Sequence, residues 1–249
     1  AVRSTTIVQT HRRPGPARLA DVPWPDEEPV AIEAIEFLTP SPLVDRSSAL
    51  SDLLASLPGS AGSVLGLVEQ VMDAVNSRLK YEKKVTTART PLSEALALGR
   101  GVCQDFAHLS LGAFRGLGVP ARYVSGYLNG PGELATHAWC QVWGGRAGWV
   151  DVDPTHSQFV TDDYVVTAVG RDFSDVPPNR GVWKGKADET INVAVQVEPI
   201  DRPPPDWSDW GEQAPWLGSS WTQFQRQGRR SAPSLKAGYR QQQSQQQQE

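Results

Sequence analysis

The chain of 249 residues has only two cysteines, no long apolar run and no excess of basic residues. Two cysteines cannot form the disulfide framework with which small secreted domains replace a hydrophobic core. No segment approaches the roughly twenty apolar residues of a membrane span, and the N-terminal residues lack the apolar region of a signal peptide. A formal net charge of −4, with only short basic clusters, gives no electrostatic reason to expect nucleic acid or an anionic membrane as a partner. We therefore expect a cytoplasmic protein that binds neither.

A hydrophobic content of 39% is enough for a core, but twenty prolines and twenty-two glycines indicate much irregular chain. Residues 1–40 are punctuated by proline and form an approach segment, and residues 41–200 form the folded domain. The tail 201–249 is rich in proline, tryptophan and glutamine and is too polar to bury much apolar surface, so we expect it to be disordered. Its tryptophans could be binding anchors, or the tail could pack back on the domain.

Hydrophobic periodicity predicts helices in the first half of the chain and strands mainly in the second. The predicted helices are 47–57, 63–79, a short helix opened by Thr90-Pro91 and closed by Gly99 or Gly101, and Cys103 to Gly116. The predicted strands are 32–37, 121–128, 137–143, 149–153 and 191–198. The fold class is therefore α+β, with helices packed on an antiparallel sheet.

Cys103 lies between a glycine turn and an apolar helix, in the stretch GRGVCQDFAH. It falls in the first turn of the predicted helix, where unpaired N–H groups stabilise a thiolate. A lone cysteine is more often a small buried hydrophobe, but that role needs no such setting. Cys103 is therefore the candidate nucleophile.

A nucleophilic cysteine needs a histidine to share its proton and a third group to orient that histidine. His137 begins one arm of a predicted hairpin, and Asp151 and Asp153 lie on the other. In an antiparallel pair of strands, the residue numbers of any two opposing residues add up to the same total. An even sum, such as His137 opposite Asp153 and Gln141 opposite Trp149, puts all odd-numbered residues on one face. A one-residue slip would separate His137 from Asp153.

The even register also makes each face of the hairpin consistent in composition. Trp139, Trp143 and Trp149 share the face of His137, where they would exclude water and strengthen a Cys–His interaction. The other face is small and apolar, which assigns Cys140 to the core. Its members are Ala138, Cys140, Val142, Val150 and Val152.

Several residues offer competing interpretations. Asp151 competes with Asp153 for the orienting role, and Asp153 could simply begin a turn before proline. His108 follows Cys103 by five positions and points elsewhere around the helix, so packing is its expected role. His156 lies beyond the strand end and is a weaker candidate for the base.

A metal site is disfavoured, and we expect neither a metal nor a cofactor. Paired CxxC motifs and calcium-loop patterns are absent. The possible ligands of a zinc site are Cys103, His137, Cys140 and His156. Side chains alternate along a strand, so His137 and Cys140 would lie on opposite faces of the hairpin and could not bind one ion together.

Three segments, GVCQDFAH, HAW and GWVDVDPTH, resemble in this order the motifs of the transglutaminase-like superfamily. The flanks LKYEKKVTTARTPLSEALALGRG, GVPARYVSGYL and GRDFSDVPPNRGVWKG resemble its bacterial branch. The resemblance covers about residues 36–198 and implies a core similar to that of papain-like cysteine proteases. By this resemblance, Cys103 is the nucleophile, His137 the base and Asp153 the orienting carboxylate.

The resemblance also makes residues 41–200 a catalytic domain and residues 1–40 a remnant of the β-domain that relatives carry before it. Gln141 stands where many relatives have glutamate, a difference expected to tune activity. The residues expected to bind substrate or support the site are Tyr81, Gln104, Trp139, Gln141, Trp149 and Asp151.

The expected reaction is acyl transfer on a carboxamide or peptide bond through a thioester at Cys103. The substrate would be a protein or peptide, such as a glutamine side chain as donor with lysine or water as acceptor. Hydrolysis and crosslinking use the same triad, so both stay open, as does the oligomeric state. The alternative is a catalytically silent module on the same fold that binds a peptide or protein through an exposed aromatic face.

Overall fold

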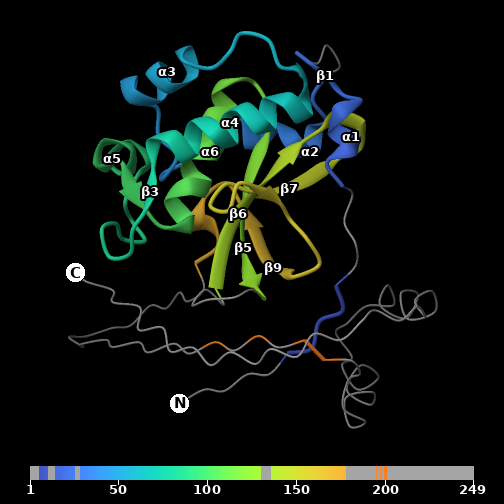
Figure 1. Ribbon diagram of the computed structural model, residues 1–249, viewed down its shortest axis with the longest axis vertical. Coiled ribbons are helices and arrows are strands. Elements are labelled where there is room, and N and C mark those ends of the chain that lie inside the picture. The colour runs from blue at the N-terminus through green and yellow to red at the C-terminus, as the bar shows by residue number, and fades with distance from the viewer. Residues whose placement is uncertain are drawn as a thin grey trace.

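The structure is a computed structural model that describes residues 6–10, 15–25, 29–129, 136–177, 195, 197, 199 and 200. In this part of the chain, a layer of helices covers a five-stranded sheet (Figure 1). The expected α+β class is confirmed. No helix within these ranges is long and apolar enough to cross a membrane.

The sheet is antiparallel, with strand order β8-β7-β6-β5-β9. Its strands are β5 (Ala121–Leu128), β6 (Thr136–Trp143), β7 (Trp149–Asp153), β8 (Gln158–Phe159) and β9 (Tyr164–Gly170). The bounds predicted for β5 and β7 are confirmed, and β6 begins one residue earlier than predicted. β9 pairs with β5 along a segment that the sequence analysis left without a strand. β6 is therefore the central strand, paired on both edges.

The helical layer consists of α3 (Ser48–Ala55), α4 (Val64–Arg78), α5 (Leu92–Leu98) and α6 (Cys103–Gly116). The hydroxyls of Ser47 and Ser63 cap α3 and α4 by accepting backbone N–H groups, so these helices begin where predicted. Short elements connect these layers. They are α1 (Ala17–Ala20), β1 (Pro23–Trp24), α2 (Ile32–Ile35), η1 (Glu36–Leu38), β2 (Gly62–Ser63), β3 (Lys80–Tyr81), β4 (Arg100–Gly101), η2 (Gly145–Ala147) and η3 (Phe173–Asp175).

The helix α6 lies at the centre of the molecule, packed between the other helices and β6. Every residue from Asp105 to Arg115 is buried, which is typical of a core helix with neighbours on all sides. Gly112 permits this close packing, since a Cβ there would lie 2.5 Å from the side chain of Leu92. The first turn of α6, with Cys103, lies at the end of this buried segment.

Two local predictions were wrong. The segment 32–37 is helical and not a strand, because its buried residues, Ala34 and Phe37, are three apart, while Ile32 is 88% exposed. Over six residues, its pattern of apolar and polar residues fitted both the helical period of 3.6 and the strand period of 2. The helix α5 begins at Leu92 and not at Pro91, because the Thr90 hydroxyl accepts from the Thr87 N–H instead of capping the helix. Its predicted end is confirmed by Gly99, whose φ is +64°.

The predicted strand 191–198 lies mostly outside the described residues, and the tail 201–249 lies wholly outside them. Both stay predictions, as do the boundaries of the three segments of the chain.

Candidate active site

The β6–β7 hairpin has the even register that the sequence favoured. Cys140 lies opposite Val152, and Gln141 lies opposite Asp151. The specific pairing of His137 with Asp153 and of Gln141 with Trp149 was wrong by two residues. The connection consists of the five residues between the predicted strands, and its 3₁₀ turn, with Gly144 N–H donating to Gly148 C=O, places Trp143 opposite Trp149. A shift of two preserves the faces, so the predicted distribution of side chains is confirmed.

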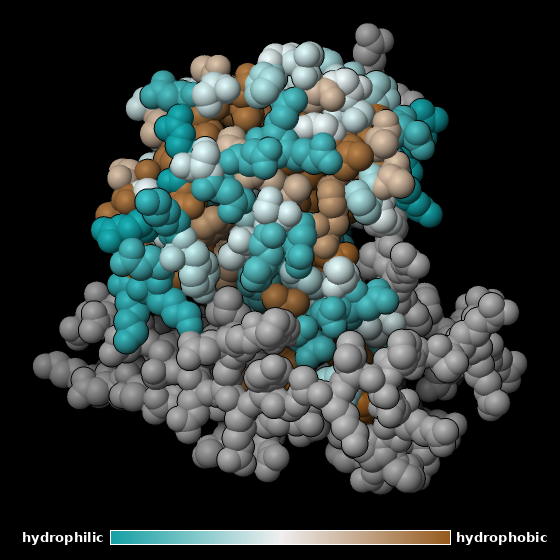
Figure 2. Space-filling model, in the orientation of Figure 1, coloured by the Kyte–Doolittle hydropathy of each residue, from teal (hydrophilic) through white to brown (hydrophobic). Residues whose placement is uncertain are grey.

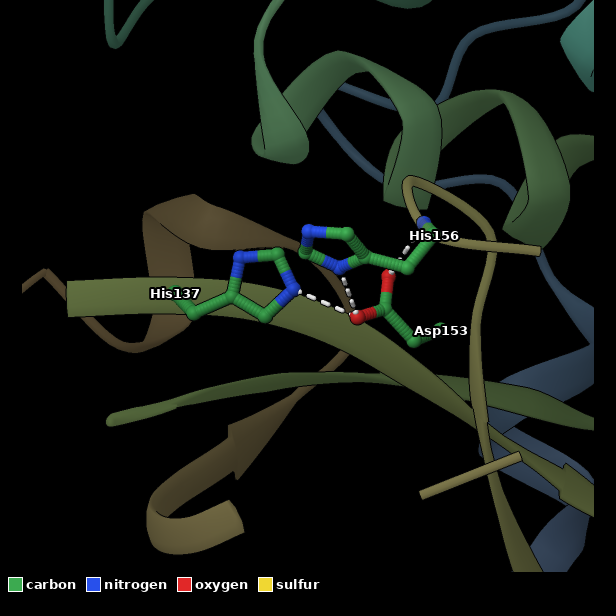
Figure 3. Close-up of side chains that lie close together, drawn as sticks. All are labelled: His137, Asp153 and His156. Atoms are coloured by element: carbon green, nitrogen blue, oxygen red, sulfur yellow. Dashed lines mark hydrogen bonds and ion pairs between the residues drawn. The ribbon is translucent and has the colours of Figure 1, made fainter. Parts of the chain in front are cut away.

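His137 and Asp153 meet on the odd-numbered face of this hairpin (Figure 3). Nε2 of His137 lies 2.7 Å from Oδ2 of Asp153, and both side chains are fully buried. The other ring nitrogen of His137, Nδ1, is buried without a hydrogen-bond partner among the described residues. The ring therefore has one nitrogen held by a carboxylate and one available for chemistry.

Asp153 holds two further side chains that the sequence analysis did not assign to it. Its Oδ2 accepts from Nδ1 of His156 at 2.7 Å and from the hydroxyl of Tyr164 at 2.6 Å. Its Oδ1 accepts the backbone N–H groups of Thr155 and His156, so the expected turn at Asp-Pro forms as well. That turn was the signal that could have brought His156 to Asp153. Tyr164 gave no comparable signal, because its strand was not predicted.

These contacts shift two pKa values in opposite directions. Burial alone would raise the pKa of Asp153, but hydrogen bonds from His137, His156 and Tyr164 and the charge of His137 lower it well below its ordinary value. Burial alone would lower the pKa of His137, but its interactions with Asp153 and Cys103 raise it to about 10. The site thus favours a carboxylate next to a protonated imidazole.

Trp139 and Asp151 support this face. The Trp139 ring stacks on His137 with the centroids 6.1 Å apart, and its edge meets Tyr164. Asp151 accepts from Nε1 of Trp139 at 2.8 Å and from Nε2 of Gln141 at 2.9 Å. These bonds show Asp151 bracing the tryptophan, whereas Asp153 is the carboxylate bonded to His137. The geometry favours Asp153 for the orienting role.

Trp149 lies in a different cluster from the one expected. The guanidinium of Arg122 lies 4.2 Å from the centre of the Trp149 ring and donates to Gln141 Oε1. Trp149 also contacts Trp143 and Phe37 edge to face. Gln141 therefore links Arg122 to Asp151, a position where glutamate would add a second charge beside an aspartate.

Cys103 is the first residue of α6 and is partly buried. The turn before it is held by Asp105, whose Oδ2 accepts from the Val102 N–H at 2.7 Å and from the Thr86 hydroxyl at 2.6 Å. Gly101 is required here, since a Cβ would lie 2.4 Å from that carboxylate. Asp105 was not predicted as a site residue, although an acid at the third position of a helix is half of a capping box.

The two remaining predicted site residues lie around this turn. Gln104 donates from Nε2 to the Ala88 carbonyl at 3.3 Å and thereby links α6 to the loop before α5. The Tyr81 ring is 39% exposed and lies 6.4 Å from the ring of Phe106 in α6. Their proposed substrate contacts stay predictions.

Cys140 and His108 belong to the core, as expected. Cys140 is fully buried and its thiol donates weakly to the Val152 carbonyl at 3.5 Å. Burial raises the pKa of this thiol far above its ordinary value, so it stays protonated. Burial lowers the pKa of His108 to about 4, and its Nε2 accepts from the Phe173 N–H.

His137, Asp153 and His156 present three potential metal-ligand atoms within 4.8 Å of one another. Two imidazoles and a carboxylate suit zinc and similar ions. Binding would require each ring nitrogen that faces the metal to lose its proton, whereas the pKa of His137 is raised to about 10. The short contacts to Asp153 also leave each donor already paired. The arrangement fits a hydrogen-bond network better than a metal centre.

Comparison with known proteins places this geometry in a family. The family model for the transglutaminase-like superfamily matches residues 52–154. An uncharacterized protein of Mycobacterium leprae is 31% identical over 210 residues, which are 79% of this chain and 72% of that protein. A protein-glutamine gamma-glutamyltransferase of Pseudomonas aeruginosa is 36% identical over 105 residues, 35% of this chain and 16% of that enzyme.

A solved structure supports the same assignment. It is a provisionally assigned cysteine protease from Cytophaga hutchinsonii, with 28% identity and a TM-score of 0.51, and the match covers 64% of this chain and 53% of that one. The chain thus spans about half of that solved structure. The chain belongs to the transglutaminase-like superfamily, and its fold is the papain-like fold of that superfamily.

Proposed function

We propose that the chain is a cysteine-dependent acyl transferase or hydrolase in which Cys103, His137 and Asp153 act together. The observation that carries the proposal is the state of His137. Asp153 holds one of its ring nitrogens at 2.7 Å, the other is buried and unpaired among the described residues, and Cys103 contributes to its raised pKa.

The mechanism follows from these positions. The Cys103 thiolate attacks the carbonyl carbon of a carboxamide or peptide bond, so a C–S bond forms and the C–N bond breaks. His137 gives its proton to the departing amine or ammonia. Water or an amine such as a lysine then attacks the thioester and passes its proton to His137, and the thiolate is released. Asp153 keeps its charge throughout and stabilises the protonated ring.

The N-terminus of α6 supports charge at the same place. Its unpaired backbone N–H groups and its dipole favour a thiolate at Cys103 and the oxyanion that forms during attack. The proposed substrate is a protein or peptide, with a glutamine side chain as one candidate donor. The gamma-glutamyltransferase name of the Pseudomonas relative is consistent with that candidate.

The second candidate function is the silent binding module, which would use an exposed aromatic face. Among the described residues, the exposed large hydrophobic side chains are scattered apart from Ile32 and Ile35, which share α2, and Tyr81 is the one aromatic in that group. Figure 2 shows hydrophilic and hydrophobic side chains mixed over the helical layer. The described surface therefore favours the enzyme.

Alkylation of Cys103 by iodoacetamide across pH 5–9 tests the proposal, with Cys140 as an internal control in the same mass spectrum. We expect labelling of Cys103 to stay rapid below pH 7, because the nearby imidazolium favours the thiolate, and to slow in His137→Ala. Buried Cys140 is expected to stay unlabelled. Labelling of Cys103 that rises only near the ordinary thiol pKa of about 8.5, or that ignores His137→Ala, would favour the binding module.

A further inference from the structure

One oxygen of the Asp153 carboxylate, Oδ2, has more hydrogen-bond donors than it has lone pairs. A carboxylate offers about four acceptor positions, two on each oxygen. Oδ1 uses its two for the backbone N–H groups of Thr155 and His156, at 2.9 and 3.3 Å. Oδ2 receives three side-chain donors, from His137, His156 and Tyr164, at 2.7, 2.7 and 2.6 Å. Three donors therefore compete for two lone pairs.

Competition weakens the bond that each donor makes. A hydrogen bond to a carboxylate is strong because the acceptor carries charge, and donors on one oxygen draw on the same charge. The orientation of Asp153 does not depend on the His156 ring, because the backbone turn holds Oδ1. The His156 ring therefore acts mainly on the strength of the bond between Asp153 and His137.

His156 is well placed for this role (Figure 3). Its ring lies 5.1 Å from the ring of His137, centroid to centroid, on the same oxygen. Its side chain is 39% exposed, whereas those of His137 and Asp153 are fully buried. The other titratable groups that interact with His137 or Asp153 are Tyr164 from β9, Cys103 from α6 and, through the charge of Asp153, Cys140 from β6. His156 is thus the exposed member of the network.

We propose that His156 is a positioning residue that limits how strongly Asp153 stabilises the protonated ring of His137. The inference rests on the proposed function, in which His137 must both give and take a proton. If Asp153 served His137 alone, the ring would hold its proton more firmly, and fewer rings would be neutral when water or an amine attacks the thioester. By sharing Oδ2, His156 keeps part of the His137 population able to act as a base.

Two variants separate this role from a simple structural one. His156→Ala removes the competing donor. His156→Asn keeps an N–H donor at the δ position, where Nδ1 of His156 stands, and serves as the matched control. Tyr164→Phe removes the other competing donor from Oδ2 and provides an independent check. The protein is treated with EDTA beforehand, so that no cation occupies the three ligand atoms.

The first measurement is the pKa of His137, followed by NMR of the ¹⁵N-labelled imidazole rings. We expect the pKa to rise by roughly half a unit in His156→Ala and in Tyr164→Phe, and to stay near the wild-type value in His156→Asn. A fall in His156→Ala would mean that His156 only braces Asp153, and an unchanged value would mean that it has no influence. Either result overturns the proposal.

The second measurement is the burst and steady-state hydrolysis of p-nitrophenyl acetate. Its leaving group needs no proton, so the burst reports acylation of Cys103 and the steady state reports deacylation, which needs neutral His137. We expect His156→Ala to slow deacylation about threefold with the burst unchanged, which follows from a half-unit rise in pKa. His156→Asn should restore the rate. A wild-type protein that shows no burst at Cys103 would refute the proposed function, whereas a normal burst with equal deacylation rates would refute the role of His156 alone.

Discussion

Two histidines are buried among the described residues, and they are in opposite electrostatic states. His137 is 3% exposed and His108 is fully buried, yet the pKa of His137 is raised to about 10 and that of His108 is lowered to about 4. Burial pushes both values down. The difference lies in the partners, since His137 shares a short hydrogen bond with the Asp153 carboxylate.

His108 has no such bond, although a carboxylate lies near it. Asp172 raises the pKa of His108 through space, and Arg115 opposes that effect. Asp172 instead accepts from the N–H groups of Leu43 and Ser174 and from the Ser174 hydroxyl. Asp153 thus stabilises the positive charge of the His137 ring, whereas Asp172 joins two parts of the backbone that are distant in the sequence. A direct hydrogen bond, and not burial alone, separates the two regions.

The largest effect is expected from removing the charge of Asp153. In Asp153→Asn, burial still lowers the pKa of His137 and only the interactions with Cys103 are left to raise it, so this pKa should fall from about 10 toward the ordinary value of about 6.5. Acyl transfer should fall by about 10³-fold, because the protonated ring loses its stabilisation. Imidazole NMR and the rate of ester hydrolysis measure the two effects. A His137 pKa that stays high would show that Asp153 is not the cause.

The matching change in the other region is Asp172→Ala. Asp172 is fully buried, and its loss leaves the N–H groups of Leu43 and Ser174 without this acceptor. We expect the free energy of unfolding to fall by about 3 kcal/mol, measured by urea denaturation, while Cys103 alkylation in the folded protein keeps its rate. Slower alkylation of Cys103 with unchanged stability would show that Asp172 acts on the reactive site and not on the fold.

His108 should make stability depend on pH in the acidic range. Its folded-state pKa of about 4 lies below its unfolded-state value of 6.5, so the unfolded chain binds the additional proton between these values. The stabilising contribution is complete above pH 6.5, decreases as the pH falls toward 4 and then levels off. It amounts to on the order of 3 kcal/mol.

Urea denaturation of the wild type and of His108→Gln at pH 7 and pH 4.5 isolates this contribution. Glutamine keeps an acceptor for the Phe173 N–H but cannot take up the proton, so the variant should lose less stability on acidification. Equal losses in both proteins would show that His108 is not responsible.

The smallest effect is expected at the second cysteine. Cys140→Ala removes a buried sulfur from the core and should cost about 1 kcal/mol of unfolding free energy. The alkylation profile of Cys103 should not change, because Cys140 lies on the opposite face of β6 from His137. A change in that profile would show that Cys140 influences the site and is not only a core residue.

Much of the fold was accessible from local patterns. The helices with serine caps and the strands next to glycine turns were predicted within a few residues, because capping and turn chemistry act over short distances. The segment 32–37 was not, because its six residues fitted two periods and only the burial of Ala34 and Phe37 decides between them. The strand β9 was missed because its stability comes from pairing with β5, far away in the chain.

The sequence by itself determined which reactive residues the site contains and that His137 and Asp153 lie on the same face of the hairpin. A cysteine at a helix start and a histidine and an aspartate on the same face of a hairpin follow from residue spacing, because side chains alternate along a strand. Only the tertiary structure brought Tyr164 to the carboxylate that His137 and His156 share. His156 and Tyr164 reach Asp153 from a turn and from a distant strand, and the resulting competition for one oxygen depends on packing in three dimensions. Electrostatic states such as those of His137 and His108 depend on such contacts, which no local pattern encodes.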